Sequence, residues 1–64
     1  MKKYVVYIFK SSVGFEIDAD IVLDDKLTWD FHKYIDDGRR ETKVVASFVI
    51  QNCYGYVLKL DDGK

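Results

Sequence analysis

The 64-residue sequence contains no proline, one cysteine and one histidine. The single cysteine, Cys53, cannot close a disulfide within the chain, and with His32 it supplies only two of the four ligands of a structural zinc site. A lone thiol is typical of proteins in a reducing compartment. We therefore expect a cytoplasmic protein that holds no metal and no other cofactor.

The sequence also lacks a long apolar segment and an excess of charge of one sign. The apolar run at residues 4–9 is far shorter than the roughly 18 residues of a membrane span. It lacks the small-residue cleavage site of a signal peptide, so we interpret it as a strand. Ten Lys and Arg nearly balance eleven Asp and Glu, and no overall field attracts the chain to nucleic acid or to a membrane. We expect no membrane partner.

Apolar and aromatic residues are abundant. They make up 48% and 16% of the chain, which is the composition of a folded protein. We predict one domain over residues 1–64. A core of this size rarely contributes more than about 3–5 kcal/mol without a disulfide, a metal or a partner subunit. Because the first two aids are missing, we expect self-association, most simply as a homodimer.

Alternation of apolar and polar residues predicts a hairpin near the N-terminus. Its strands are residues 3–10 and 15–22, and Gly14 lies in the turn between them. Hairpin closure pairs Val6 with Ala19. This register puts seven side chains on one face: Tyr4, Val6, Ile8, Phe15, Ile17, Ala19 and Ile21.

Between residues 24 and 38 the apolar spacing is that of a helix. Leu27, Phe31, Tyr34 and Ile35 lie at i, i+4, i+7 and i+8, which is one helix face. Gly38 is a typical helix end. We expect this helix to cover the apolar face of the first hairpin.

Two further strands, residues 42–51 and 56–60, predict a second hairpin. The fold class is then α+β, a single small domain of order β-β-α-β-β. Its antiparallel sheet has the order 2-1-3-4 and one helix packed on one face. Hairpin pairing assigns six residues to the core side of these strands: Val45, Ser47, Val49, Tyr56, Leu58 and Leu60.

The sheet face away from the helix is too apolar for a solvated surface, and such patches commonly mark interaction sites. Trp29 falls on the exposed side of the predicted helix and is a further candidate, because tryptophan is enriched at interfaces. The candidate partner-binding residues are Val5, Tyr7, Phe9, Trp29, Phe48, Ile50 and Val57. The alternative is that the sheet curls to bury both faces within one chain, or that the assignment of strand faces is wrong.

No motif predicts an enzyme. The sequence has no glycine-rich phosphate loop, no H-E-x-x-H and no G-x-S-x-G. His32 and Asp36 have the spacing of an ordinary helix-surface pair. We interpret Glu16, Asp18 and Asp20 as charges that protect a sheet edge. A calcium loop that started at Asp18 or Asp20 would have Leu23 or Asp25 in place of its required glycine.

The function that these features predict is that of a small non-catalytic protein–protein interaction module or protein inhibitor, homodimeric through its apolar sheet face. One alternative is a single-stranded nucleic-acid-binding module that stacks bases on sheet aromatics. Its residues would be Tyr7, Phe9 and Phe48 with Lys10, Lys43 and Lys59. The acids of residues 16–20 oppose it because they repel phosphates. The other alternative is a structural subunit of a larger assembly.

Overall fold

The computed structural model describes residues 1–59, and it is built almost entirely from strands. The elements in this range are β1 Lys2–Ile8, β2 Phe15–Ala19, β3 Ile21–Asp24, β4 Thr28–Tyr34, β5 Thr42–Val49, the 3-10 turn η1 Ile50–Asn52 and β6 Cys53–Lys59. The predicted α+β class is therefore wrong, and the fold is nearly all-β. Across residues 1–59, no helix has the length and apolar character needed to cross a membrane.

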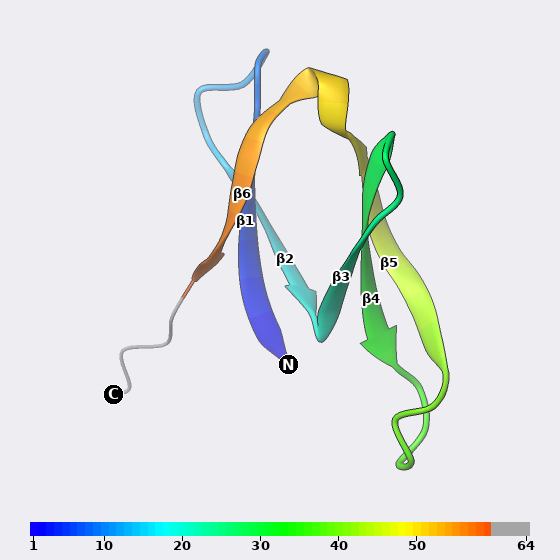
Figure 1. Cartoon of the computed structure of the whole chain (residues 1–64). Helices are drawn as coiled ribbons and strands as arrows, with labels where there is room; N and C mark the ends of the chain where they lie inside the picture. Colours follow the sequence, from blue (N-terminus) through cyan, green and yellow to red (C-terminus); the bar gives the residue numbers. More distant parts are fainter. Residues whose placement is uncertain (60–64) are drawn as a thin grey trace.

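The strands form two three-stranded antiparallel sheets that face each other (Figure 1). Sheet A has the order β2-β1-β6, and sheet B has the order β3-β4-β5. A bend at Asp20 carries the chain directly from β2 into β3, and η1 joins β5 to β6 at the opposite end. A strand that switches sheets through a bend makes a corner of the structure. The predicted single sheet of order 2-1-3-4 is thus divided into two.

The segment predicted as a helix, residues 24–38, contains the turn between β3 and β4 and the whole of β4. Lys26 has a φ of 64° in the turn, and its N–H donates to Asp24 Oδ1 at 3.0 Å. The N–H of Asp25 donates to the carbonyl oxygen of Thr28 at 2.9 Å and closes the turn. Residues 28–34 contain one threonine and three aromatic residues, Trp29, Phe31 and Tyr34, which favour strands. The helical spacing is outweighed because β4 pairs on both sides, with β3 and with β5.

The predicted second hairpin is also wrong, because β5 and β6 lie in different sheets. β5 pairs with β4 and β6 pairs with β1. The N–H of Ile50 donates to the carbonyl oxygen of Leu27 at 2.9 Å, which ties η1 to the β3–β4 turn. This turn of the chain, rather than a hairpin loop, directs β6 toward sheet A.

The core side of β5 is the opposite of the one predicted. Ala46 and Phe48 pack against the core, whereas Val45 and Val49 are exposed. The hydroxyl of Ser47 lies outside the core and donates to a carboxylate of β4. On β6, Tyr56 does contact the core rings, as predicted. Leu60, assigned to the same side, lies outside the described residues.

The first hairpin is confirmed, with a different register. β1 pairs antiparallel with β2, and Val6 lies opposite Phe15 instead of Ala19, a shift of four positions. An even shift leaves the side chains of β1 and β2 on their predicted faces. Accordingly Tyr4, Val6 and Ala19 all point into the core and are buried. Ile21, assigned to the same face, lies in β3 instead, where its neighbour Val22 packs against the core.

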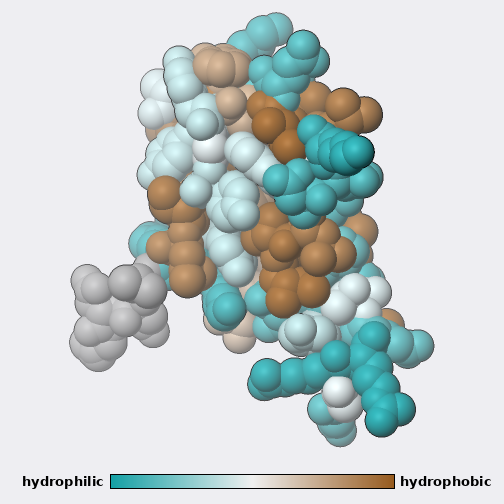
Figure 2. All heavy atoms as spheres, in the orientation of Figure 1, coloured by the Kyte–Doolittle hydropathy of each residue, from teal (hydrophilic) through white to brown (hydrophobic). Residues whose placement is uncertain are grey.

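The core lies between the two sheets and is small. Its buried residues are Tyr4, Val6, Ala19, Phe31 and Cys53. The Phe31 ring meets the rings of Tyr4 and Tyr56 edge to face, with centroids 5.4 and 5.5 Å apart. Because three strands about 4.8 Å apart span little width, the molecule is flat, with Cα extents of 37 × 33 × 13 Å. Much apolar surface stays exposed, and Figure 2 shows it over both sheets.

Candidate functional site

The face of sheet A that points away from sheet B carries exposed apolar side chains. Val5 and Val57 lie opposite each other on β1 and β6, and Tyr7 follows Val5 on the same face. Val57 is 50% exposed and Tyr7 is 43% exposed. This face therefore offers a line of aliphatic and aromatic contacts to solvent.

An aromatic pair extends this line beyond the end of β1. The N–H of Phe9 donates to the carbonyl oxygen of Asn52 at 3.0 Å, which continues the ladder between β1 and β6 by one residue. Phe9 thus stays on the side of Tyr7. Its ring packs edge to face on Tyr54, with centroids 4.3 Å apart. We name Val5, Tyr7, Phe9, Tyr54 and Val57 the outer row.

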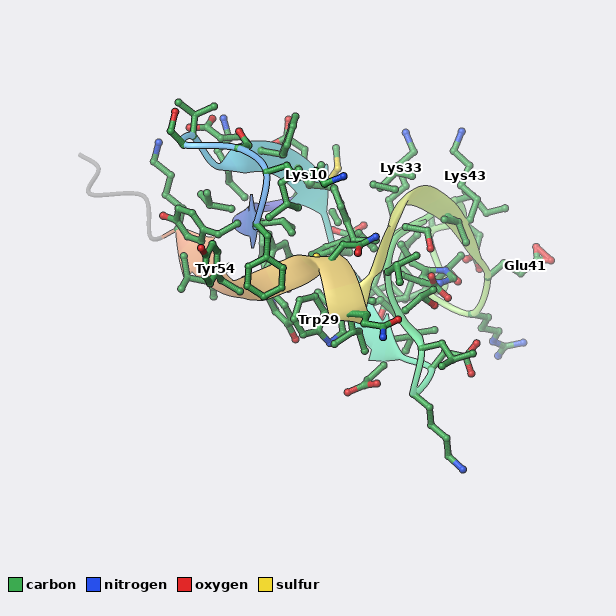
Figure 3. The ribbon with its side chains drawn as sticks, turned by 90° about the horizontal axis from the view of Figure 1, so that it is seen from above. Lys10, Trp29, Lys33, Glu41, Lys43 and Tyr54 are labelled. Atoms are coloured by element: carbon green, nitrogen blue, oxygen red, sulfur yellow. The ribbon has the colours of Figure 1, made fainter. Side chains whose placement is uncertain are left out.

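Tyr54 is the most exposed member of the outer row, at 72%. It occupies the extra position of a β-bulge, because Tyr7 lies opposite Gly55 and Ile8 opposite Cys53. In Figure 3 it projects from the sheet A side, well apart from Lys33 and Lys43 on sheet B. Bulges commonly redirect a side chain. Sequence reasoning missed Tyr54 because residues 52–55 were assigned to a hairpin loop.

Part of the outer row also has a structural role. Gly14 lies against Val5 and Tyr7, and a Cβ atom at this position would meet Val5 Cγ1 and approach Tyr7 Cε1 to 3.0 Å. On the other strand, Tyr7 lies opposite Gly55. The Tyr7 ring therefore lies against Gly14, whereas a Cβ atom at Gly55 would meet no atom within 4 Å.

Charged side chains of both signs flank the outer row across all three strands of sheet A. Lys59 Nζ lies 3.1 Å from Glu16 Oε2, and Lys3 Nζ lies 3.6 Å from Glu16 Oε1 and 3.9 Å from Asp18 Oδ1. The hydrogen bond and the charge of Lys59, helped by Lys3, lower the pKa of Glu16. Two cations and two anions cancel, so this end of the face carries no net charge.

The structure brings together four of the seven predicted partner-binding residues and separates three. Trp29 packs against the core, 4.9 Å from the Tyr56 ring, and Figure 3 places it between the sheets. Phe48 also faces inward, 5.8 Å from the Phe31 ring. Ile50 is half-buried in η1. These three differ from the prediction because it placed Trp29 on a helix and inverted the faces of β5.

A shallow hollow lies beside the aromatic pair, lined by Ile8, Phe9, Lys10 and Asn52. Apart from Lys10, its lining has no ionisable side chain. The hollow therefore makes the surface beside Phe9 concave, and it is not a reactive site.

The groups with possible chemistry are dispersed. His32 Nδ1 lies 3.0 Å from Thr42 Oγ1 on the outside of sheet B. The Ser47 hydroxyl donates to Asp30 Oδ1 at 2.6 Å and lowers the pKa of Asp30. Asp36, predicted to pair with His32, instead accepts from the N–H groups of Arg40 and Glu41 in the next loop. Over residues 1–59, no group of three or more His, Cys, Asp or Glu can hold a metal ion.

The nucleic-acid hypothesis named three aromatics and three lysines, and the structure scatters them. Tyr7 and Phe9 lie in the outer row, but Phe48 points into the core. Lys59 is bound to Glu16, and Lys43 lies on sheet B. The outer row remains a set of exposed apolar side chains on one face of sheet A. Comparisons of this chain with protein-family models, with curated proteins and with solved structures find no match.

Proposed function

We propose that the chain is a small non-catalytic protein-binding module, or an inhibitor that acts by covering a partner's surface. Its binding surface is the outer row. The observation that carries the proposal is the alignment of five apolar side chains on one face of sheet A, four of them exposed by 43% or more. Contiguous apolar surface of this kind commonly marks an interaction site.

The aromatic pair is the expected anchor of the interface. Tyr54 and Phe9 are 72% and 53% exposed, and their rings support each other at 4.3 Å. Aromatic side chains dominate binding energy in protein interfaces because they bury a large area with few rotatable bonds. A pair that is already packed loses less conformational freedom on binding than two separate side chains would.

The chemistry of the face favours an apolar protein surface as the occupant. Lys3, Glu16, Asp18 and Lys59 neutralise one another beside the row. A polyanion would meet the two carboxylates, whereas a protein partner can pair its own rim charges with both signs. A cytoplasmic location is part of the proposal, because a lone cysteine is typical of proteins in a reducing compartment.

A photo-crosslinking experiment in the source cells tests the proposal. Benzoyl-phenylalanine replaces Tyr54 in one variant and Tyr34, on the outside of sheet B, in the matched control. We expect a defined protein product from position 54 alone. With the purified partner, Tyr54→Ala should weaken binding by about tenfold or more, equal to about 1.4 kcal/mol, and Tyr34→Ala should not.

Other products would overturn the proposal in distinguishable ways. A product containing only a second copy of the chain would show that position 54 contacts another copy and no separate target protein. A nuclease-sensitive product would support nucleic-acid binding. Equal products from positions 54 and 34 would show that the outer row has no special role.

A further inference from the structure

β6 forms a free edge of sheet A. The strand order is β2-β1-β6, and no strand within residues 1–59 pairs with the other side of β6 (Figure 1). An edge strand presents unpaired backbone N–H and C=O groups, which can pair with a strand of another chain. Native proteins usually protect such edges with charges, bulges or very short strands.

The other edges of the two sheets have this protection. β2 carries Glu16 and Asp18, and β3 is only four residues long. β5 has a bulge opposite Phe31, which breaks the alternation of its faces. From Gly55 to Lys59, in contrast, β6 pairs regularly with β1 and carries no charge before its last residue. Within the described residues, this stretch of β6 is the least protected edge.

The same stretch is complementary to itself. An antiparallel pairing of two copies about Val57 places Val57 opposite Val57, Tyr56 opposite Leu58, and Gly55 opposite Lys59. Each pair joins residues that point to the same side of the sheet, because strand side chains alternate with a period of two. Glycine opposite Lys59 leaves that lysine free to keep its contact with Glu16.

Both sides of β6 have apolar surface to bury in such a pairing. Leu58 is 44% exposed and Tyr56 is 36% exposed on the side of the core, and Val57 is 50% exposed on the side of the outer row. Aromatic–aliphatic and aliphatic pairs directly across neighbouring strands are favourable. The edge therefore offers side-chain contacts in addition to backbone hydrogen bonds.

We propose that two copies of the chain pair antiparallel through β6, with Val57 on the two-fold axis. Sheet A then continues into the second copy as a six-stranded sheet of order β2-β1-β6-β6-β1-β2. The two outer rows come to lie side by side on one face and stay open to a partner. This association uses the edge of sheet A rather than its face, and it does not depend on the proposed binding function.

Light scattering of the full chain over a range of concentrations is the first test. We expect the molar mass to rise with concentration toward that of two chains. Leu58→Asp, which puts a carboxylate opposite Tyr56 of the second copy and lies outside the outer row, should weaken the dimer by about tenfold or more. The matched control is Val49→Asp on β5, which should dimerise like the wild type. A constant monomer mass would overturn the proposal.

Cysteine crosslinking tests the register and does not depend on how well a charged variant folds. Val57→Cys, Tyr56→Cys and Leu58→Cys are oxidised in parallel, with the wild type as the blank because its one thiol is buried. Residues directly opposite on neighbouring strands have the Cβ separation that a disulfide needs. The covalent dimer should form fastest at position 57. Equal rates at the three positions, or a rate at position 57 no higher than the blank, would contradict pairing through β6.

Discussion

At the scale of single residues, Cys53 shows how burial controls chemistry. Its Sγ donates to the carbonyl oxygen of Val49 at 3.3 Å, and burial raises the pKa of the thiol. The buried site favours the neutral thiol, which is the form present at neutral pH, so burial of Cys53 does not reduce the stability of the folded state there. Stability falls as the pH rises above the ordinary pKa of a cysteine thiol, because the thiol then loses its proton more readily in the unfolded state than in the folded state.

We therefore predict that Ellman's reagent modifies Cys53 slowly in the native protein at pH 8 and rapidly in denaturant. The reason is that only an exposed thiolate is a good nucleophile. The absorbance of the released thiolate gives both rates. Equal rates with and without denaturant would contradict a buried thiol.

Gly14 provides a second prediction at this scale. In Gly14→Ala, the new methyl group would overlap Val5 Cγ1 and crowd the Tyr7 ring, so these side chains must move. We expect a loss of about 1 kcal/mol, seen as a fall of roughly 4–8 °C in the melting temperature. Ser12→Ala, in the same loop and exposed, is the control. An unchanged melting temperature in Gly14→Ala would mean that Val5 and Tyr7 do not cover this position.

At the scale of elements, the β4–β5 hairpin contains a like-charge pair. Lys33 lies directly opposite Lys43, and the two side chains run side by side in Figure 3. Within residues 1–59, neither forms an ion pair with a carboxylate. Like charges directly opposite on neighbouring strands are unfavourable.

Lys43→Glu should convert this repulsion into attraction. We expect stabilisation by roughly 0.2–1 kcal/mol at low salt, with a smaller gain as salt screens the pair. Thermal melts at two salt concentrations measure the effect. Lys10→Glu, which changes the net charge equally at another site, is the control. The same gain in both variants would point to overall charge rather than to this pair.

At the scale of the whole molecule, the small core leaves little reserve of stability. Phe31 is fully buried and its ring contacts those of Tyr4, Phe48 and Tyr56, so it joins both sheets. Replacing a buried phenylalanine by alanine typically costs about 3–5 kcal/mol. That is as much as a core of this size supplies.

We therefore predict that Phe31→Ala is largely unfolded at 25 °C, whereas Phe31→Leu still folds with a lower melting temperature. Circular dichroism and urea titration distinguish the two. Leu27→Ala, at an exposed position in the β3–β4 turn, should leave stability nearly unchanged. A folded Phe31→Ala variant with near-native stability would place the main core elsewhere.

Several features of this protein follow from the sequence alone because they depend on near neighbours. The alternation over residues 15–22 and the turn before it predict the first hairpin and its two faces. The face, although not the register, survives in the structure because an even shift keeps side-chain direction. Val5, Tyr7 and Phe9 of the outer row follow in the same way. Val57 was assigned to this face through the second hairpin, which the structure does not contain.

Only the tertiary structure decides which distant strands pair. Residues 28–34 have apolar spacing that fits a helix and side chains that fit a strand, and their two neighbours in sheet B favour the strand. The bend at Asp20 and the turn η1 send consecutive strands to different sheets, which brings Trp29 and Phe48 into the core. The pairing of β1 with β6, which are far apart in the sequence, brings Phe9 into contact with Tyr54. Local alternation predicts the faces of β1 and β2 because they pair with each other in one hairpin. It does not predict the core side of β5, because that side depends on strand partners distant in sequence.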